Sequence, residues 1–249
     1  MVNYIFLGIL QGIFEWIPIS SEGIVALASH FLIKEANPID LALFLHLGTF
    51  SAVMIYFRKD WRKVLLLKNP SLLRFLIMAT VISLAIGYPF YKLISQAATG
   101  AILLLIVGLG LFLTAYANKF RNFLGLGQIK NLTVLAGLVG FLQGLAVIPG
   151  LSRSGTTIFG LSLSRLSPSQ ILKISYMMSA PLVLASSAYL FWKNPLLIAG
   201  WPSLISSFLV GLISLSFLMK LAEKMNFYRF ALIFALLCFA GGIIGLIVY

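Results

Sequence analysis

Apolar runs separated by short polar stretches recur along the whole chain. Six of these runs are long enough for a helix to cross the roughly 30 Å hydrocarbon core of a bilayer. The predicted spanning helices cover residues 38–57, 75–95, 99–118, 171–192, 202–220 and 229–248. This pattern is typical of a polytopic membrane protein built from α-helices.

Two further apolar segments are too short to cross. Residues 2–17 and 132–148 each end in a cluster of Pro, Gly and Ser, and apolar sequence then resumes at 23–34 and 155–164. Each leg covers roughly 22 Å or less as a helix, so we expect two re-entrant helical hairpins. Irregular backbone at membrane depth needs protein or a water-filled cavity around it, and such turns commonly mark a site.

The two hairpin segments resemble each other. Leu10-Gln11-Gly12, Ile17-Pro18 and Ser20-Ser21-Glu22-Gly23 correspond to Leu142-Gln143-Gly144, Ile148-Pro149 and Ser152-Arg153-Ser154-Gly155, at an offset of 131 or 132 residues. Three predicted spans follow each copy, and an odd number of crossings inverts the second half. We therefore predict inverted repeats over residues 1–124 and 125–249, although chance similarity between apolar segments is an alternative. Inverted repeats place binding sites at their interface, near the midplane.

Charge is scarce and unevenly distributed. Only 10% of the 249 residues are charged, against about 25% in a typical soluble domain. Fourteen of the 18 Lys and Arg residues fall on one predicted face, mostly in the loops 58–74, 119–130 and 220–229. The positive-inside rule makes these loops cytoplasmic and puts both termini outside a cell membrane. This distribution explains the net charge of +12 without a nucleic-acid partner.

The second hairpin turn carries a strong anion-binding signal. Arg153 lies at membrane depth, where an unpaired charge costs at least about 2.5–3.5 kcal/mol, so it is functional by default. It begins a half-helix whose free N–H groups favour an anion, and its planar fork matches phosphate oxygens. Nearby hydroxyls come from Ser152, Ser154, Thr156 and Thr157. The alternative is that these hydroxyls are helix caps and Arg153 is a structural ion-pair partner.

The first hairpin turn supplies carboxylates. Gln11 and Glu15 lie four residues apart, on one helix face. Glu15 is either catalytic or a counter-ion to Arg153, and Glu22 is by default a helix cap. His46 lies in the first span at about the depth of the turns, as a hydrogen-bond donor or a catalyst. Two His and six acidic residues give no convincing all-protein metal cage. Everything depends on the two turns meeting inside the bilayer.

At these motifs the sequence resembles the undecaprenyl-diphosphate phosphatase, or bacitracin-resistance, family. That family carries E-x-x-x-E … P-x-S-S-x-G-H in the first repeat and P-G-x-S-R-S-x-x-T in the second, and the second motif matches here through Thr157. The resemblance extends along the whole chain, including Leu45-His46-Leu47-Gly48-Thr49. It implies dephosphorylation of a polyprenyl diphosphate to the monophosphate carrier lipid, usually with Mg²⁺ or Ca²⁺.

The resemblance also assigns roles. Ser21 is the candidate nucleophile, Glu15 the acid/base or metal-binding carboxylate, and Arg153 the phosphate clamp. Residues expected to bind substrate are Gln11, Ser20, Ser152, Ser154, Thr156 and Thr157. Gln11 and Ile24 replace the Glu and His of the family motif, so we hypothesise that Glu22 or His46 partly compensates.

Two questions stay open at this point. Loss of the Glu and His would also suit a non-catalytic transporter or scramblase of phosphorylated polyprenyl lipids, from which an enzyme differs by releasing phosphate. Gly241-Gly242-Ile243-Ile244-Gly245 has the small-residue spacing of a close helix contact. That contact is either a homodimer interface or packing within one chain.

Overall fold

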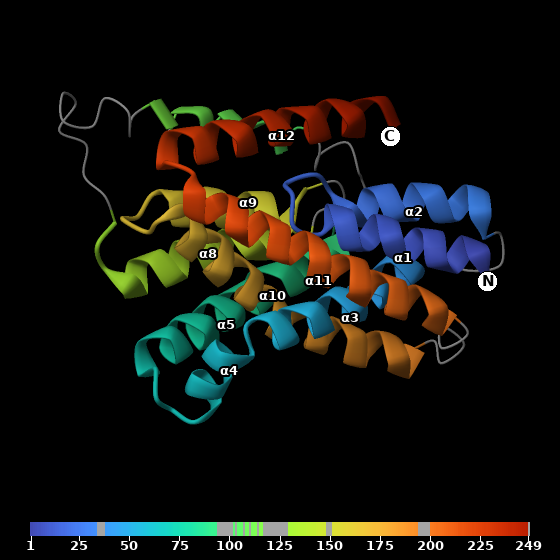
Figure 1. Ribbon diagram of the computed structural model, residues 1–249, viewed down its shortest axis with the longest axis horizontal. Coiled ribbons are helices and arrows are strands. Elements are labelled where there is room, and N and C mark those ends of the chain that lie inside the picture. The colour runs from blue at the N-terminus through green and yellow to red at the C-terminus, as the bar shows by residue number, and fades with distance from the viewer. Residues whose placement is uncertain are drawn as a thin grey trace.

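The computed structural model describes residues 1–33, 38–93, 129–147, 151–193 and 200–248, together with scattered positions between 102 and 116. These residues are helical apart from turns and one isolated bridge between Ile129 and Ser164. The helices are α1 (Val2–Phe14), α2 (Ser21–Leu32), α3 (Pro38–Tyr56), α4 (Arg58–Leu65), α5 (Pro70–Leu93), α8 (Leu132–Leu145), α9 (Arg153–Ser162), α10 (Pro168–Lys193), α11 (Trp201–Lys224) and α12 (Phe227–Val248). The all-α class is confirmed (Figure 1).

Fewer membrane spans are found than the six predicted. By length and composition, three of the described helices can cross a bilayer, at Pro70–Phe90, Trp201–Lys224 and Phe227–Ile247. Helices α3 and α4, bent by 81° at their junction, count as a fourth if they form one span. Helix α10, with 26 residues, is not among them; the side chains of its last six residues, which belong mostly to the predicted span 171–192, lie outside the described part of the chain. Nearly half of the predicted span 99–118 lies outside the described residues, which cover it only at scattered positions.

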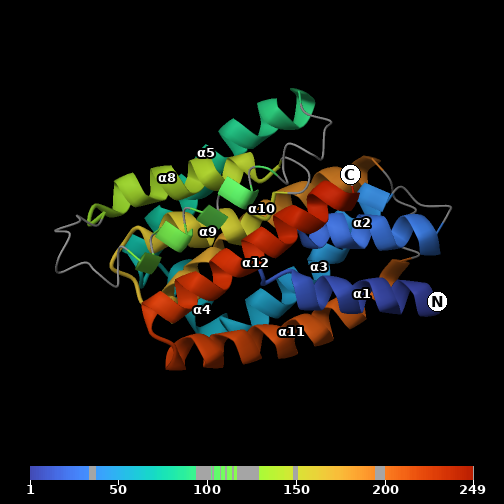
Figure 2. The same cartoon turned by 90° about the horizontal axis from the view of Figure 1, so that it is seen from above.

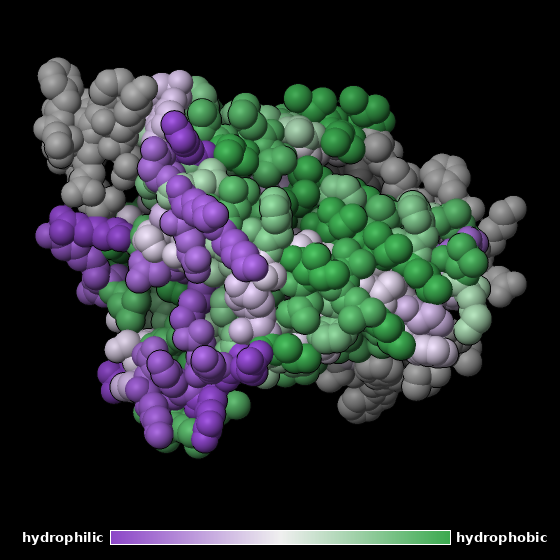
Figure 3. Space-filling model, viewed as in Figure 1, coloured by the Kyte–Doolittle hydropathy of each residue, from purple (hydrophilic) through white to green (hydrophobic). Residues whose placement is uncertain are grey.

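The molecule exposes apolar side chains and buries polar ones. Ile213, Phe217 and Ile247 are each more than half exposed, whereas Ser175, Ser203 and Ser207 are fully buried. In lipid, an apolar surface carries no penalty, and interhelical contacts favour small and hydroxylated residues. Figure 3 shows hydrophilic side chains gathered at one end of an otherwise hydrophobic face. Both chain termini lie at the opposite end of the molecule (Figure 1).

Two helical hairpins occupy opposite ends of the molecule. Helices α1 and α2 lie at the end that carries the N-terminus and α8 lies towards the other end, in both Figure 1 and Figure 2. With 13 and 14 residues, α1 and α8 are too short to cross about 30 Å of hydrocarbon. The four hairpin helices agree closely with the four predicted legs. Residues 148–150 of the second turn lie outside the described part of the chain.

Each hairpin packs closely against a long helix through glycines. In α1, a side chain at Gly12 would meet the backbone of Gly211 at 2.7 Å and that of Ser207 at 3.1 Å. In α8, a side chain at Gly140 would meet the carbonyl of Ala79 at 2.7 Å. Helix α1 of the first half therefore packs closely against α11 of the second half, and α8 of the second half packs closely against α5 of the first half. Such reciprocal packing between the two halves is what two inverted repeats would produce. The boundaries of the repeats stay a prediction.

Gly241 in α12 makes close contacts within one chain. A side chain at Gly241 would lie 3.1 Å from Leu104 and 3.2 Å from the Cα of Ile19. Gly241 therefore makes room for the first hairpin turn within the monomer. Of the two interpretations of these glycines, this contact favours packing within one chain.

The glycine contact of α8 gives a direct test of the packing. We expect Gly140→Ala to lower the apparent melting temperature, because the new methyl group has no space and overpacking costs roughly 1–3 kcal/mol. The matched control is Gly137→Ala on the same helix, whose methyl would have its nearest neighbour at 4.0 Å. Thermal unfolding in detergent, followed by tryptophan fluorescence, measures both. Equal melting temperatures for the two variants would contradict the close α8–α5 contact.

Candidate active site

A serine caps the helix that follows each hairpin turn. Ser20 precedes α2 and accepts a hydrogen bond from the Gly23 amide at 3.2 Å. Ser152 precedes α9 and accepts one from the Gly155 amide at 3.2 Å. Side-chain capping of this kind fixes where a helix begins. Two half-helices therefore start beside one cavity, with their free N–H groups at its wall.

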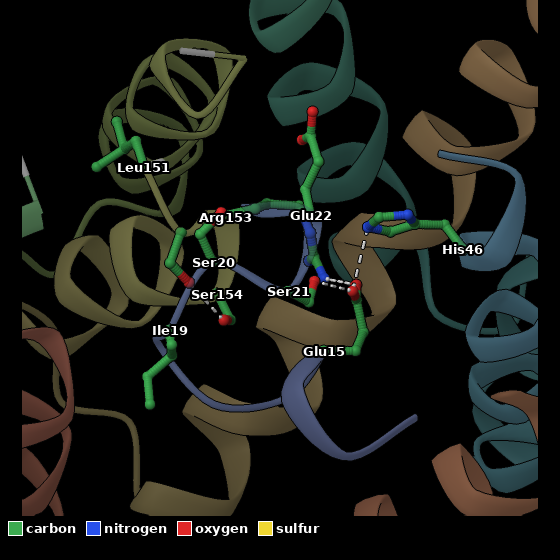
Figure 4. A pocket seen from close by; sticks show the side chains of 10 residues that line it. Glu15, Ile19, Ser20, Ser21, Glu22, His46, Leu151, Arg153 and Ser154 are labelled. Atoms are coloured by element: carbon green, nitrogen blue, oxygen red, sulfur yellow. Dashed lines mark hydrogen bonds and ion pairs between the residues drawn. The ribbon is translucent and has the colours of Figure 1, made fainter. Parts of the chain in front are cut away.

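Glu15 is the hub of the cavity (Figure 4). Its side chain is only 3% exposed, and both carboxylate oxygens accept from neighbouring groups. Arg153 Nη2 lies 2.6 Å from Oε1, and Gln11 Nε2 lies 2.8 Å from Oε2. Ser21 Oγ donates to Oε2 at 2.9 Å, and His46 Nε2 lies 3.2 Å from the same atom. One buried carboxylate thus connects the first hairpin, the second hairpin and α3.

Arg153 holds the two turns together. Its guanidinium donates to Glu15 and, through Nη1, to the carbonyl of Ser175 in α10 at 3.3 Å. A second bridge between the hairpins runs from Ser154 Oγ to the carbonyl of Ile17 at 2.9 Å. The structure therefore brings together turns that are 138 residues apart in sequence.

The predicted ring of hydroxyls is only partly at the cavity. Ser20, Ser21, Ser152 and Ser154 line it. Thr156 and Thr157 do not line it, because their hydroxyls donate back to the carbonyl of Arg153 at 2.9 Å. Such bonds to the preceding turn are common for hydroxyl side chains inside a helix. Gln11 also lies behind the cavity wall and contacts it through Glu15.

The two auxiliary candidates occupy different positions. His46 presents Nε2 to Glu15 and Nδ1 to the carbonyl of Ala42 at 2.8 Å, so both ring nitrogens face oxygen acceptors. Only a protonated ring donates from both nitrogens. Glu22 lies in the first turn of α2 and lines the same cavity, but in Figure 4 its carboxylate points away from the Glu15 cluster.

Three supporting residues were not predicted from the sequence. The hydroxyl of Tyr176 donates to the carbonyl of Trp16 at 2.7 Å, and the indole of Trp16 donates to the carbonyl of Gly211 and to Ser214. Ser175 contacts Thr157 through its hydroxyl at 2.7 Å. A buried Tyr or Trp generally finds a hydrogen-bond partner for its polar atom. A Tyr or Trp within an apolar segment of the sequence therefore predicts a buried hydrogen bond, and this signal could have found Trp16 and Tyr176.

The cavity is small. Its volume of about 40 Å³ has room for roughly three water molecules, at about 10–15 Å³ for each. Arg153 lies at the wall of this cavity and donates to Glu15. A phosphate that takes up the same guanidinium therefore competes with the carboxylate.

A divalent ion does not fit on Glu15 in this arrangement. Both carboxylate oxygens are already occupied by donors, and one of these donors is the cationic guanidinium of Arg153. Hard cations such as Mg²⁺ need free oxygen ligands. Over the described residues, no group of three or more His, Cys, Asp or Glu side chains is placed to hold a metal ion. The cofactor requirement stays a prediction, and the mechanism proposed below includes no metal-dependent step.

The buried ion pair predicts strong coupling between its partners. We expect Glu15→Gln to lower the unfolding free energy by about 3–5 kcal/mol, because it leaves a buried guanidinium without a counter-charge. In the Glu15→Gln/Arg153→Gln double variant, much of that loss should be recovered. Thermal unfolding of the single and double variants in detergent measures the coupling.

A more exposed ion pair supplies the control. Lys173 and Asp60 lie 2.5 Å apart, but their side chains are 32% and 27% exposed. Pairs close to solvent contribute only about 0–1 kcal/mol. A cycle with Lys173→Gln and Asp60→Asn should therefore show weaker coupling. Additive losses at Glu15 and Arg153 would argue against the buried pair.

Comparison with known proteins shows the family of the chain. The family model for the bacitracin resistance protein BacA matches residues 4–243. The undecaprenyl-diphosphatase of Haloarcula marismortui is 35% identical over 96% of each chain, and that of Sulfurisphaera tokodaii is 32% identical over 92% of each. A third, from Syntrophotalea carbinolica, is 32% identical over 92% of this chain and 93% of its own. The chain therefore belongs to the BacA family of bacitracin resistance proteins.

Proposed function

We propose that this protein hydrolyses a polyprenyl diphosphate, such as undecaprenyl diphosphate, to the monophosphate carrier lipid and inorganic phosphate. The observation that carries the proposal is the Arg153–Glu15 contact at a cavity lined by hydroxyls and flanked by two half-helix N-termini. Relatives that align with more than nine-tenths of the chain are named undecaprenyl-diphosphatases. An isoprenoid tail suits the apolar exterior, because it can stay in lipid while its headgroup enters the cavity.

Arg153 binds the diphosphate by exchanging partners. Its guanidinium leaves Glu15 and takes up phosphate oxygens, for which its planar fork is well matched. The amides at the starts of α2 and α9 and the hydroxyls of Ser152 and Ser154 add donors. As the transferred phosphoryl group develops charge, these preorganised groups stabilise it.

Ser21 and Glu15 form the attacking pair. The Ser21 hydroxyl already donates to Glu15 Oε2 at 2.9 Å, so the carboxylate is within reach to accept its proton. The Ser21 oxygen then attacks the terminal phosphorus, and the bond to the bridging oxygen breaks to release the lipid monophosphate. Glu15 passes the Ser21 proton to the departing monophosphate. Water then hydrolyses the phosphoserine, with Glu15 accepting a proton from the water and returning it to the Ser21 oxygen as inorganic phosphate leaves. The alternative is direct attack by a water that Glu15 activates.

Gln11 and Ile24 are the two departures of this chain from the family motif, and His46 lies near the site they affect. Gln11 donates to Glu15 at 2.8 Å and so keeps that carboxylate oriented and anionic. Ile24 offers no polar chemistry, whereas His46 places a ring nitrogen 3.2 Å from Glu15. We infer that His46 takes over part of the lost histidine function. Glu22 is the second auxiliary candidate, with its carboxylate at the same cavity.

The orientation proposed for the protein follows from charge. The basic end of the molecule faces the cytoplasm under the positive-inside rule, so both termini lie outside. The six spans and two re-entrant hairpins of the inverted repeat are proposed on the same basis. The homodimer stays a hypothesis, with Gly241 assigned to packing within the chain.

Removing the guanidinium tests the function. We expect purified protein in detergent to release phosphate from undecaprenyl diphosphate, and Arg153→Ala to lower kcat/KM by at least about tenfold through lost transition-state stabilisation. The matched control is Arg165→Ala, an exposed arginine just beyond the same helix, which should keep the wild-type rate. A wild-type protein that moves or binds the lipid without releasing phosphate would support the scramblase alternative instead.

Neighbouring serines separate the two forms of attack. Ser21→Ala should lower kcat by at least about a hundredfold if its oxygen is the nucleophile. Ser20→Ala removes the cap of α2 and one hydroxyl of the cavity lining, but not the hydroxyl bonded to Glu15, so we expect a cost of about 1 kcal/mol in stability and a modest change in rate. Phosphate release by both variants is measured with melting temperatures alongside. A near-normal rate in Ser21→Ala would assign the attack to water.

A further inference from the structure

A basic hollow lies at one end of the molecule and shares no lining residue with the active site. Helix α4 follows α3 after a sharp bend of 81°. Lys59, Arg62, Lys63 and Lys68, with Leu66, line a hollow of about 390 Å³ beside α4. In Figure 3 hydrophilic side chains cover this corner of the molecule. We call this set of five residues the α4 hollow.

The turn after α4 is built to form the hollow. The amide of Lys68 donates to the carbonyl of Lys63 at 2.8 Å, and the amide of Leu67 donates to that of Val64 at 3.1 Å. This is the Schellman pattern, which normally has glycine at the left-handed position. Here Leu67 occupies it, with φ of 57°. The turn folds Lys68 back towards the helix and places its charge beside Arg62 and Lys63.

The cations of the α4 hollow have no acidic partner. Asp60, the acid within α4, pairs with Lys173 of α10 at 2.5 Å. That contact and buried Val64 fix α4 against the body of the protein. Across the described residues, none of the ion pairs includes Lys59, Arg62, Lys63 or Lys68. Four positive charges around one hollow therefore call for an anion from outside the chain.

Three consecutive leucines show what kind of anion fits. Leu65, Leu66 and Leu67 are 71%, 52% and 69% exposed, directly beside the cations. In water such a triplet would be unfavourable, whereas at a bilayer surface it inserts among acyl chains. Cations at the headgroup level and leucines just below match the two parts of a charged lipid. A soluble phosphate would use the cations alone.

We propose that the α4 hollow binds the phosphate headgroup of an anionic phospholipid of the surrounding leaflet. Leu65, Leu66 and Leu67 contact its acyl chains, and Arg62, Lys63 and Lys68 contact its phosphate. The site is separate from the Arg153 cavity and does not depend on the proposed phosphatase function.

The test is lipid retention in native mass spectrometry of the purified full chain. Dioleoyl phosphatidylglycerol is the probe and dioleoyl phosphatidylcholine the neutral reference. We expect retention of phosphatidylglycerol over phosphatidylcholine and at least about a tenfold weaker retention in Arg62→Gln/Lys63→Gln/Lys68→Gln, because each cation near an anionic headgroup adds attraction. All three side chains are exposed, so their replacement leaves the packed core unchanged.

A charge-matched variant isolates the hollow. Lys220→Gln/Lys224→Gln/Arg229→Gln removes three exposed cations from the α11–α12 turn and should retain phosphatidylglycerol as the wild type does. Arg153→Ala should also retain it, which separates this site from the active site.

Three results would overturn the proposal. Equal losses in the two triple variants would show a diffuse charge effect. Equal retention of the two lipids would show no headgroup recognition. Displacement of phosphatidylglycerol by millimolar inorganic phosphate would assign the hollow to a soluble anion.

Discussion

The structure depends on one buried ion pair between segments that the sequence places far apart. Arg153 and Glu15 meet at 2.6 Å with side chains that are 14% and 3% exposed. At membrane depth neither charge is tolerated without a partner, so each hairpin turn requires the other. The pair also satisfies polar groups around it, since Glu15 accepts from Gln11 and Ser21 as well. Breaking it exposes two charges and an irregular backbone together, which explains why both turns converge on one point.

The surrounding helices make this meeting geometrically possible. Each hairpin is too short to cross the membrane, so it must be held by helices that do. Glycines let α1 and α8 approach α11 and α5 at backbone distance, and the Tyr176–Trp16 bond fixes the first turn from α10. Because the hairpin of each half packs against a long helix of the other half, the site lies where the two halves meet. In lipid there is no hydrophobic driving force for helices to associate, so close packing and hydrogen bonds hold these helices together.

Local features could be predicted from the sequence, and long-range ones could not. The four hairpin legs follow from the lengths of apolar runs and from the Ser-rich turns, and a lone Arg153 in apolar sequence marks a site on physical grounds alone. Thr156 and Thr157, which were expected to bind substrate, do not line the cavity, because a helical hydroxyl can donate to the carbonyl of its own preceding turn instead. Ser175 and Tyr176 were missed because their role depends on which helix packs behind the turn. The number of spans stays a prediction, because parts of the predicted spans 99–118 and 171–192 lie outside the described residues.

Charge exchange at the ion pair explains how so small a cavity can serve a diphosphate. While Arg153 is bonded to Glu15, the carboxylate is a weak proton acceptor, because a cation stabilises its negative charge. A diphosphate brings more negative charge than one carboxylate, so it competes well for the guanidinium. Once Arg153 turns to the phosphate, Glu15 loses a counter-charge and becomes a better acceptor for the Ser21 proton. Under the proposed function, substrate binding therefore opens the cavity and activates the base in one step, and an empty site stays closed and unreactive. Gln11 suits this exchange, because a second carboxylate at that position would repel the anion that must enter.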